Sequence, residues 1–396
     1  IGRSPHNRVS RVDLWMNEKD FKVGCYTPSA EGKNNLQNRK KRIIFTTTVA
    51  VLALVVLLVV AGLVYYKSKI GLLQYNDGTV SKPGEIAETD EEMMAESAAM
   101  EQALKNLEEK QAIEAEGEIF GDENVFNILL IGTDDRTKEF SGNARGDTCM
   151  LMSINKKTMA MKLISFERGI GVPILDGAYK GQYDWLTHTF RYGGADLMMR
   201  EIRECFKIDV RHYVRANIYT FMQLVDSVGG VDIELTQEET DYINHPEGTY
   251  GESHIREMGV ADQIQSVVPG VNHLNGATAM LYARCRYIDN DWHRVKRQRN
   301  VIQAAIYQTQ NLNLLELNSM LDHVLPMVQT NLTEKEITSL MLLAPRYQGI
   351  TLEQMTIPED GTYGSMIGMG GRSMFSVDFN QNAQILQSFI YGVEKP

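Results

Sequence analysis

The sequence predicts an α/β fold, a β-sheet covered by helices, for residues 124–396. Short apolar runs typical of buried strands alternate there with segments of helical spacing, over about 270 residues. Glycine and capping residues mark the ends of these segments. Because a sheet and a helix must each bury an apolar face, this alternation implies helices layered on a sheet, an α/β sandwich.

The expected elements follow one another in a definite order. Strands are predicted at 125–131, 148–154, 161–166, 212–217 and 231–235, and helices at 195–206, 219–228, 275–281, 337–343 and 382–391. The first strand is a continuous apolar run that ends at Gly132, which suits a buried strand. Asn275 is placed to cap one helix, and Thr333 and Glu336 form the capping-box pattern that opens another.

An apolar run without charged residues, 43–64, precedes this domain. A helix of about 22 residues, rising about 1.5 Å per residue, spans the hydrocarbon core of a bilayer. Four basic residues, 39–42, stand directly before the run, and only Lys67 and Lys69 follow it closely. The positive-inside rule therefore places the N-terminus in the cytoplasm and the remainder outside the cell. We expect a single-pass signal anchor at 43–66 in the cell membrane, because the run is longer than the apolar region of a cleaved signal peptide.

Charge is distributed unequally along the chain. The net charge is -11, yet residues 1–42 carry ten Lys/Arg against four Asp/Glu. An acidic chain is unsuited to general nucleic-acid binding, which requires an excess of Lys and Arg. Residues 1–42 are polar and lack a pattern, so we expect a disordered cytoplasmic tail.

The segment between the expected anchor and the domain, 67–123, becomes rich in Glu, Ala and Met in its second half. Its apolar residues Ile86, Met93, Met100 and Leu107 recur every seven positions. We expect an acidic linker followed by a helical stalk. The heptad spacing leaves a stalk-mediated dimer open, and a solvated acidic spacer is the plainer alternative.

Two acidic motifs flank predicted strands. Asp134 comes just after the first strand, and Asp147 comes just before the second. Ligands of open α/β sheets bind beyond the carboxyl ends of strands. Two converging carboxylates could hold Mg²⁺, a hard cation that prefers oxygen ligands and often shares its shell with substrate phosphates. Taken alone, each aspartate is more often a turn or cap residue.

A basic cluster stands out in the acidic domain, with six Lys/Arg close together against two Asp. Arg284 and Arg286 point the same way if the backbone is extended, and Arg294 and Gln298 share one face of a helix. Guanidinium groups in such a set suit a multiply charged anion. Arg168, after a predicted strand, could join them. A solvated basic helix face is the plain alternative.

The sequence contains no GxSxG, HExxH or Walker A pattern, so serine-triad and P-loop chemistry have little support. The residue types favour phosphoryl transfer, in which positioning and charge neutralisation do most of the catalysis. Six blocks within 124–310 resemble, in order and spacing, those of LytR-CpsA-Psr domains. They are residues 127–136, 145–148, 164–168, 192–194, 225–232 and 274–298.

The resemblance implies an α/β/α sandwich with a mixed central β-sheet, preceded by one transmembrane helix, whose apolar interior holds a polyprenyl chain. It implies an extracellular, membrane-anchored enzyme of cell-wall biogenesis. Such an enzyme transfers a glycopolymer, for example teichoic acid or capsule, from undecaprenyl pyrophosphate to peptidoglycan. A hydrolase that uses water as acceptor and a non-enzymatic envelope regulator, of the transcriptional-attenuator type, are the alternatives.

The resemblance also implies roles for particular residues. Asp134 and Asp147 would hold Mg²⁺, with Mn²⁺ as an alternative, against the pyrophosphate. Asp291 would act near the attacking hydroxyl, as its base, and Arg136 and Arg145 would support the pyrophosphate site at its rim. The pyrophosphate clamp itself would consist of Arg168, Arg284, Arg286, Arg294 and Gln298.

The chain departs from the family pattern at two places. Glu167, Arg168 and Gly169 stand where the family usually has Pro-Arg-Asp, so an acidic side chain is missing after Arg168. Glu167 does not replace it, because neighbouring strand residues face opposite ways. Residues 187–189, Thr-His-Thr, stand where members often carry Asn-x-Ala. If these groups assist catalysis, slower turnover or a different acceptor preference is expected.

Overall fold

The computed structural model describes residues 57, 64–65, 67–79, 91–135, 138–142, 144–247, 249–285, 288, 291–347 and 349–392. The chain divides into two units, Ile1–Tyr65 and Tyr66–Pro396, and the fold below is that of the second. Within the described residues no helix combines the length and the apolar character needed to cross a bilayer. The tail expected at 1–42 and nearly all of the anchor expected at 43–66 lie outside them.

A seven-stranded mixed sheet forms the centre of the domain. In spatial order its strands are β1 (Gln74–Tyr75), β10 (Gln329–Thr330), β7 (His212–Asn217), β2 (Val125–Thr133), β3 (Thr148–Asn155), β4 (Met161–Phe166) and β11 (Leu352–Ile357). The strand β7 runs parallel to β2, and β11 runs parallel to β4, whereas β3 is antiparallel to both of its neighbours. The mixed sheet confirms the prediction.

The strands of this sheet divide alternate side chains between two apolar layers. Leu129 of β2 and Leu151 of β3 belong to the main core on one face. Met150 of β3 and Leu163 of β4 belong to a smaller cluster on the other face. Because both faces are covered, a strand can bury side chains on both sides, which is why β2 and β3 appear in the sequence as nearly continuous apolar runs.

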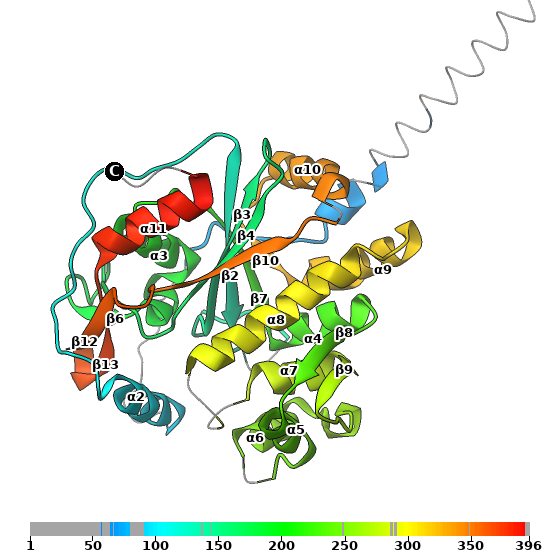
Figure 1. The fold of residues 1–396 in the computed structure, drawn as a ribbon. Helices are drawn as coiled ribbons and strands as arrows, with labels where there is room; N and C mark the ends of the chain where they lie inside the picture. The colour runs from blue at the N-terminus through cyan, green and yellow to red at the C-terminus, as the bar shows by residue number, and fades with distance from the viewer. Residues whose placement is uncertain are drawn as a thin grey trace, which may run out of the picture. The chain divides into compact units, whose positions relative to one another are not determined.

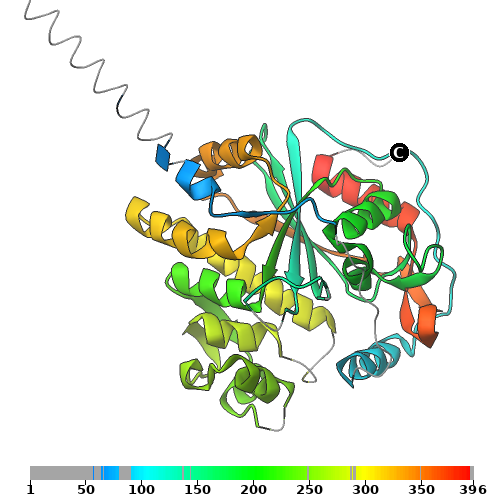
Figure 2. The same ribbon diagram turned by 180° about the vertical axis from the view of Figure 1, so that it is seen from behind.

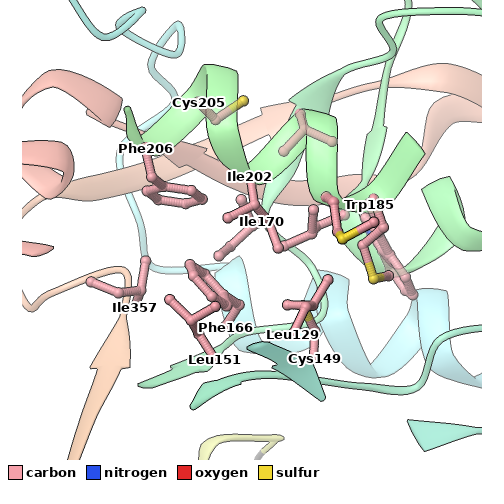
Figure 3. Close-up of a cluster of buried hydrophobic side chains, with 14 of the residues drawn as sticks. Leu129, Cys149, Leu151, Phe166, Ile170, Trp185, Ile202, Cys205, Phe206 and Ile357 are labelled. Atoms are coloured by element: carbon pink, nitrogen blue, oxygen red, sulfur yellow. The ribbon is translucent and has the colours of Figure 1, made fainter. Parts of the chain in front are cut away.

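Helices α3 (Thr189–Phe206) and α11 (Phe379–Tyr391) cover the first face of the sheet (Figure 1). Figure 3 shows part of the core beneath them, in which Phe206 and Ile202 of α3 face Phe166 of β4. The rings of Phe166 and Phe206 are 5.1 Å apart between centroids. Tightly packed aromatic and aliphatic side chains thus fill the space between this face and its helices.

The helix α8 (Asp291–Thr309) covers the second face, where Ile302 and Ile306 pack against the cluster around Met150. Figures 1 and 2 show α8 and its neighbouring helices on the side of the sheet opposite α3 and α11. Helices on both faces confirm the predicted sandwich. Further α-helices among the described residues are α4 (Ile218–Ser227), α5 (Gln237–Asn244), α6 (Tyr250–Met258), α7 (Gly276–Ala283), α9 (Leu314–Val324) and α10 (Glu334–Leu343).

Three strand pairs lie outside the central sheet. The strand predicted at 231–235 forms as β8 (Val231–Leu235), but it pairs with β9 (Gly270–Leu274) in a separate two-stranded sheet. A short apolar run gives no signal of which partner a strand takes. The other two pairs are β5 (Gly171–Pro173) with β6 (Tyr183–Trp185), and β12 (Tyr363–Ile367) with β13 (Ser373–Val377).

The helix α2 (Glu91–Leu104) belongs to the domain, which corrects the expectation of a separate helical stalk at 67–123. Met100 and Leu104 are buried in the main core, and α2 lies beside β13 in Figures 1 and 2. The strand β1 is also part of the central sheet. A heptad spacing specifies an apolar stripe but not the surface that covers it. Here Met100 of that stripe packs against the chain's own core.

Helices α4 and α7 pack closely at a glycine. A Cβ on Gly276 would lie 2.3 Å from the carbonyl oxygen of Met222 in α4. The preceding Asn275 caps α7, as predicted, by accepting a hydrogen bond from the backbone N–H of Thr278. The other end of α7 is capped by Arg284, so the position of this arginine depends on the contact between α4 and α7.

Replacing Gly276 with alanine is expected to destabilise the fold by about 1–3 kcal/mol, because the backbone of α4 cannot move aside as a flexible side chain can. Unfolding in urea would measure the loss. Gly71→Ala is a matched control, since the nearest atom to its added Cβ is 3.4 Å away, and a change within about 0.5 kcal/mol is expected there. Equal stability of the two variants would contradict the packing argument.

Candidate functional site

A cavity of about 330 Å³ lies between the sheet and the helices of its second face. Ligand sites in proteins commonly enclose about 300–1,000 Å³. Most of its lining is apolar and comes from Leu130, Val214, Ile218, Phe221, Leu224, Met280, Ile302, Val324 and Val328. Walls of this kind suit a hydrocarbon chain.

The charged residues and the glutamine in the cavity lining come from three separate parts of the chain. Asp147 precedes β3, Arg284 caps the end of α7, and Arg294 and Gln298 lie on α8. The side-chain amide oxygen of Gln298 accepts a 3.0 Å hydrogen bond from Oγ1 of Thr148, the first residue of β3. Segments separated by about 140 positions therefore meet around one apolar space, which is the arrangement that recognition of an anionic amphiphile requires.

The two predicted aspartates lie against the same guanidinium group. Oδ1 of Asp134 accepts a 2.6 Å hydrogen bond from the backbone N–H of Arg145, and Oδ2 accepts a 2.9 Å hydrogen bond from its Nε. The same Nε lies 4.0 Å from Oδ1 of Asp147. Arg145 is thus placed between the carboxylates of Asp134 and Asp147, which stand at the two ends of the loop that joins β2 to β3.

Arg168 extends this ion network. Its Nη2 donates to Oδ1 of Asp147 at 3.0 Å and to Oε2 of Glu96 at 2.7 Å. Nη1 of Arg145 lies 3.9 Å from the same oxygen of Glu96. Glu96, Arg145 and Arg168 are buried, where charged groups are strongly held by their partners.

The loop that carries Asp134 is anchored by a second buried ion pair. Nη2 of Arg215 on β7 lies 3.0 Å from Oδ1 and 2.9 Å from Oδ2 of Asp135. The carboxylate of Asp135 also accepts hydrogen bonds from the hydroxyl of Thr133 and the backbone N–H of Ser141. Burial lowers the pKa of Arg215, and the negative charge of Asp135 opposes this shift. Consecutive aspartates therefore bind arginines from different parts of the chain.

The structure separates the predicted site residues into three groups. Those that line the cavity are Asp147, Arg284, Arg294 and Gln298. Those that form the ion network around Asp147 without lining the cavity are Asp134, Arg145 and Arg168. Those that lie outside the described residues are Arg136, Arg286 and the side chain of Asp291, whose backbone begins α8. The functional roles of all ten stay a prediction.

One argument from spacing fails. The backbone of Arg284 has φ −107° and ψ 9° at the cap of α7, which is not the extended conformation assumed for Arg284 and Arg286. Arg294 and Gln298 do share a helix face, and both line the cavity. Helical spacing is reliable here because α8 is a long helix.

Sequence reasoning did not identify two residues that take part in these ion pairs, Arg215 and Glu96. Arg215 sits in a predicted strand that carries no motif, and Glu96 sits in the segment expected to be a stalk. No local sequence pattern marks these two residues, because each is recognised only by the charged side chain that it contacts in the folded protein.

The resemblance implies Mg²⁺, and Asp134 and Asp147 are the residues that would hold it. Among the residues that the structure describes, no group of three or more His, Cys, Asp or Glu could hold a metal ion. Mg²⁺ is commonly bound through one or two carboxylates, with water and substrate phosphates completing its shell. Asp134 and Asp147, which share Arg145, fit this second arrangement.

Comparisons with known proteins relate the whole domain to one family. The chain matches the LytR-CpsA-Psr family model over residues 89–389. It is 32% identical over 225 residues to biofilm regulatory protein A of Streptococcus mutans, across 54% of this chain and 52% of that protein, so it spans about half of that relative's length. It is 28% identical over 240 residues to a Bacillus cereus protein named polyisoprenyl-teichoic acid–peptidoglycan teichoic acid transferase TagU, across 59% of this chain and 69% of that protein.

Solved structures share the fold. A structure of TagT bound to LI-WTA superimposes with a TM-score of 0.52 at 23% identity, covering 72% of this chain and 97% of that one. Bacillus subtilis TagV superimposes with a TM-score of 0.53 at 21% identity, covering 68% and 98%. The family match begins ahead of residue 124 and takes in α2, in agreement with the packing of that helix. The chain belongs to the LytR-CpsA-Psr family.

Proposed function

We propose that this chain is a phosphotransferase of cell-wall biogenesis, which transfers a glycopolymer from a polyprenyl pyrophosphate carrier to peptidoglycan. The observation that carries the proposal is an apolar cavity with Asp147, Arg284 and Arg294 in its lining. Guanidinium groups beside apolar walls suit an amphiphile whose hydrocarbon chain ends in a strong anion. The printed name of TagU, which describes transfer of a polyisoprenyl-linked teichoic acid to peptidoglycan, supports the same chemistry.

In this proposal the prenyl chain occupies the apolar cavity and the pyrophosphate binds at Arg284 and Arg294. The acceptor hydroxyl attacks the phosphorus that bears the polymer, the bond from that phosphorus to the bridging oxygen breaks, and the polyprenyl phosphate leaves. Asp291, one helical turn before Arg294, takes the hydroxyl proton. Arg145 and Arg168 orient the aspartates rather than contact the prenyl chain.

Two finer elements complete the proposal. Asp134 and Asp147 would hold Mg²⁺, or Mn²⁺ in its place, and the cation would supply charge neutralisation for the phosphates. The expected anchor, 43–66, would hold the chain in the cell membrane with the domain outside, because the proposed carrier is itself confined to a bilayer.

Removing the Arg284 guanidinium is expected to lower kcat/KM for transfer by about 100-fold or more, because a preorganised cation at the developing charge is lost. The measurement uses the full-length Arg284→Ala protein in vesicles with a labelled lipid-linked polymer and isolated peptidoglycan. Both polyprenyl phosphate release and label on peptidoglycan are quantified. Arg346→Ala, at an exposed arginine, is the matched control.

The two products separate the alternative activities. Release of polyprenyl phosphate together with label on peptidoglycan supports transfer. Release without attachment would identify the hydrolase alternative, and absence of both in the unmodified protein would leave a non-enzymatic regulator as the better account. Unchanged turnover in Arg284→Ala would remove the proposed role of the cavity arginines.

Chelation of divalent cations is expected to abolish transfer, and added Mg²⁺ or Mn²⁺ is expected to restore it. Asp134→Asn should raise the Mg²⁺ concentration needed for half-maximal rate by at least about 10-fold. Asp176→Asn is the control, because Asp176 is exposed and outside the network. Full activity in the chelator would exclude the cation from the reaction.

A larger side chain in the cavity is expected to weaken binding of the prenyl chain without affecting the pyrophosphate. Ala216 lines the cavity, and Ala216→Phe should raise KM for a long-chain carrier by about 10-fold or more, since steric misfit in an apolar site costs roughly 1–3 kcal/mol. A carrier with only two isoprene units should be affected much less. Val271→Phe, at a position that is 72% exposed, is the control. An equal loss with both carriers would place the prenyl chain elsewhere.

A further inference from the structure

Glu96 reaches the ion network from a helix that precedes every motif of the sequence. Its Oε2 accepts the 2.7 Å hydrogen bond from Nη2 of Arg168, and that same nitrogen donates to Asp147. Glu96 is only 6% exposed and Arg168 only 3%. The contact is therefore enclosed by protein, where a charge-assisted hydrogen bond is strong and its loss is costly.

The helix α2 packs closely against Gly169 through Met100. A Cβ at this position would lie 2.3 Å from Cε and 2.9 Å from Sδ of Met100. The φ angle of Gly169 is outside the left-handed region, so the constraint is space rather than backbone conformation. A methyl group there would need only a shift of the flexible Met100 side chain, but a carboxylate would face its apolar end. Gly169 thus keeps open the place into which α2 packs.

These two observations concern the same arginine. At position 169 the family pattern places an acidic residue directly after Arg168, and this chain has glycine there. In the structure a carboxylate reaches Arg168 from α2, beside the space that the glycine leaves. We propose that Glu96 is a positioning residue for the transfer reaction, delivered by α2 to hold Arg168 against Asp147. This inference rests on the proposed function.

The physical role of Glu96 is to divide the guanidinium between two carboxylates. Arginine pairs most strongly with a single carboxylate when it binds both of its oxygens. Without Glu96, the guanidinium of Arg168 is expected to turn fully towards Asp147 and engage its second oxygen. That movement draws Asp147 away from the cavity that it lines. The rate of transfer should fall, while binding of the prenyl chain in the apolar cavity is retained.

The test compares substitutions in the full-length protein. Glu96→Gln keeps the shape of the side chain and removes its charge, and it should lower kcat about 10-fold or more with less than a twofold change in KM for the carrier. Glu96→Asp should recover part of the loss. Glu101→Gln, at an exposed position of the same helix, is the matched control and should behave as the unmodified protein.

Relocation of the carboxylate is the more demanding test. In a background of Glu96→Gln with Met100→Ala, which empties the space beside residue 169, the further change Gly169→Asp places a carboxylate next to Arg168. It should raise kcat several-fold over that background. No gain from relocation, or full kcat in Glu96→Gln at unchanged thermal stability, would overturn the proposal. Should Glu96→Gln fail to fold, kcat is compared instead between Met100→Ala alone and Met100→Ala combined with Glu96→Asp.

A spectroscopic signal distinguishes failure of this inference from failure of the proposed function. The guanidinium carbon of Arg168 lies 6.0 Å from the ring centroid of Trp185. With Trp15 and Trp292 replaced by Phe, the fluorescence of Trp185 reports movement of that cation. Its emission should shift in Glu96→Gln and not in Glu101→Gln, whether or not the protein turns over a carrier. Identical spectra would refute the link between Glu96 and Arg168, whereas a shift without turnover in the unmodified protein would refute only the proposed transfer.

Discussion

Pairing of buried charge is the constraint on which the site depends. Arg145, Arg168 and Arg215 are at most 4% exposed, and removing the partner of a buried charge costs about 3–5 kcal/mol. Each guanidinium is therefore held at a carboxylate, either on the loop between β2 and β3 or, for Glu96, on α2. Asp134 and Asp135 are bound in this way by arginines from different parts of the chain. Because Arg215 lies on β7, its pair with Asp135 holds the start of the loop against the central sheet.

The central sheet serves two purposes with one set of strands. On its first face α3 and α11 close a dense core around residues such as Leu129 and Phe206. On its second face the strands contribute Leu130 and Val214 to an open cavity under α4, α7 and α8. Since strand residues alternate between faces, a substitution on the first face changes mainly the packing of the core. A substitution on the second face changes mainly the shape of the cavity. The dense face supplies the rigidity that a precisely placed ion network needs.

Sequence reasoning succeeded where the signal is local and failed where it is tertiary. The bounds of β4 and β7 were predicted as the structure has them, although Lys162 interrupts one strand and Arg215 the other. The cap at Asn275 was predicted from its own side chain. No local sequence pattern indicates the pairing of β8 with β9 or the burial of Met100. The same holds for the contacts of Glu96 and Arg215. Each depends on which surface the chain meets after folding. The resemblance to a family pointed to four of the residues that line the cavity, but it gave no information on the contact between α2 and Gly169.

Because 67–123 is not a separate stalk, the expected anchor is joined to the domain by a shorter segment of chain than the sequence suggested. The sequence suggested an intervening segment at 67–123, but β1 joins the central sheet at Gln74 and α2 joins the core. Only residues 67–73 then separate the predicted end of the anchor from the sheet. A fragment that begins at 124 would lose β1, the buried residues Met100 and Leu104, and Glu96, the carboxylate that reaches Arg168 from α2. Stability and the geometry around Asp147 are therefore coupled to the N-terminal segment, and the functional domain begins before the first family motif.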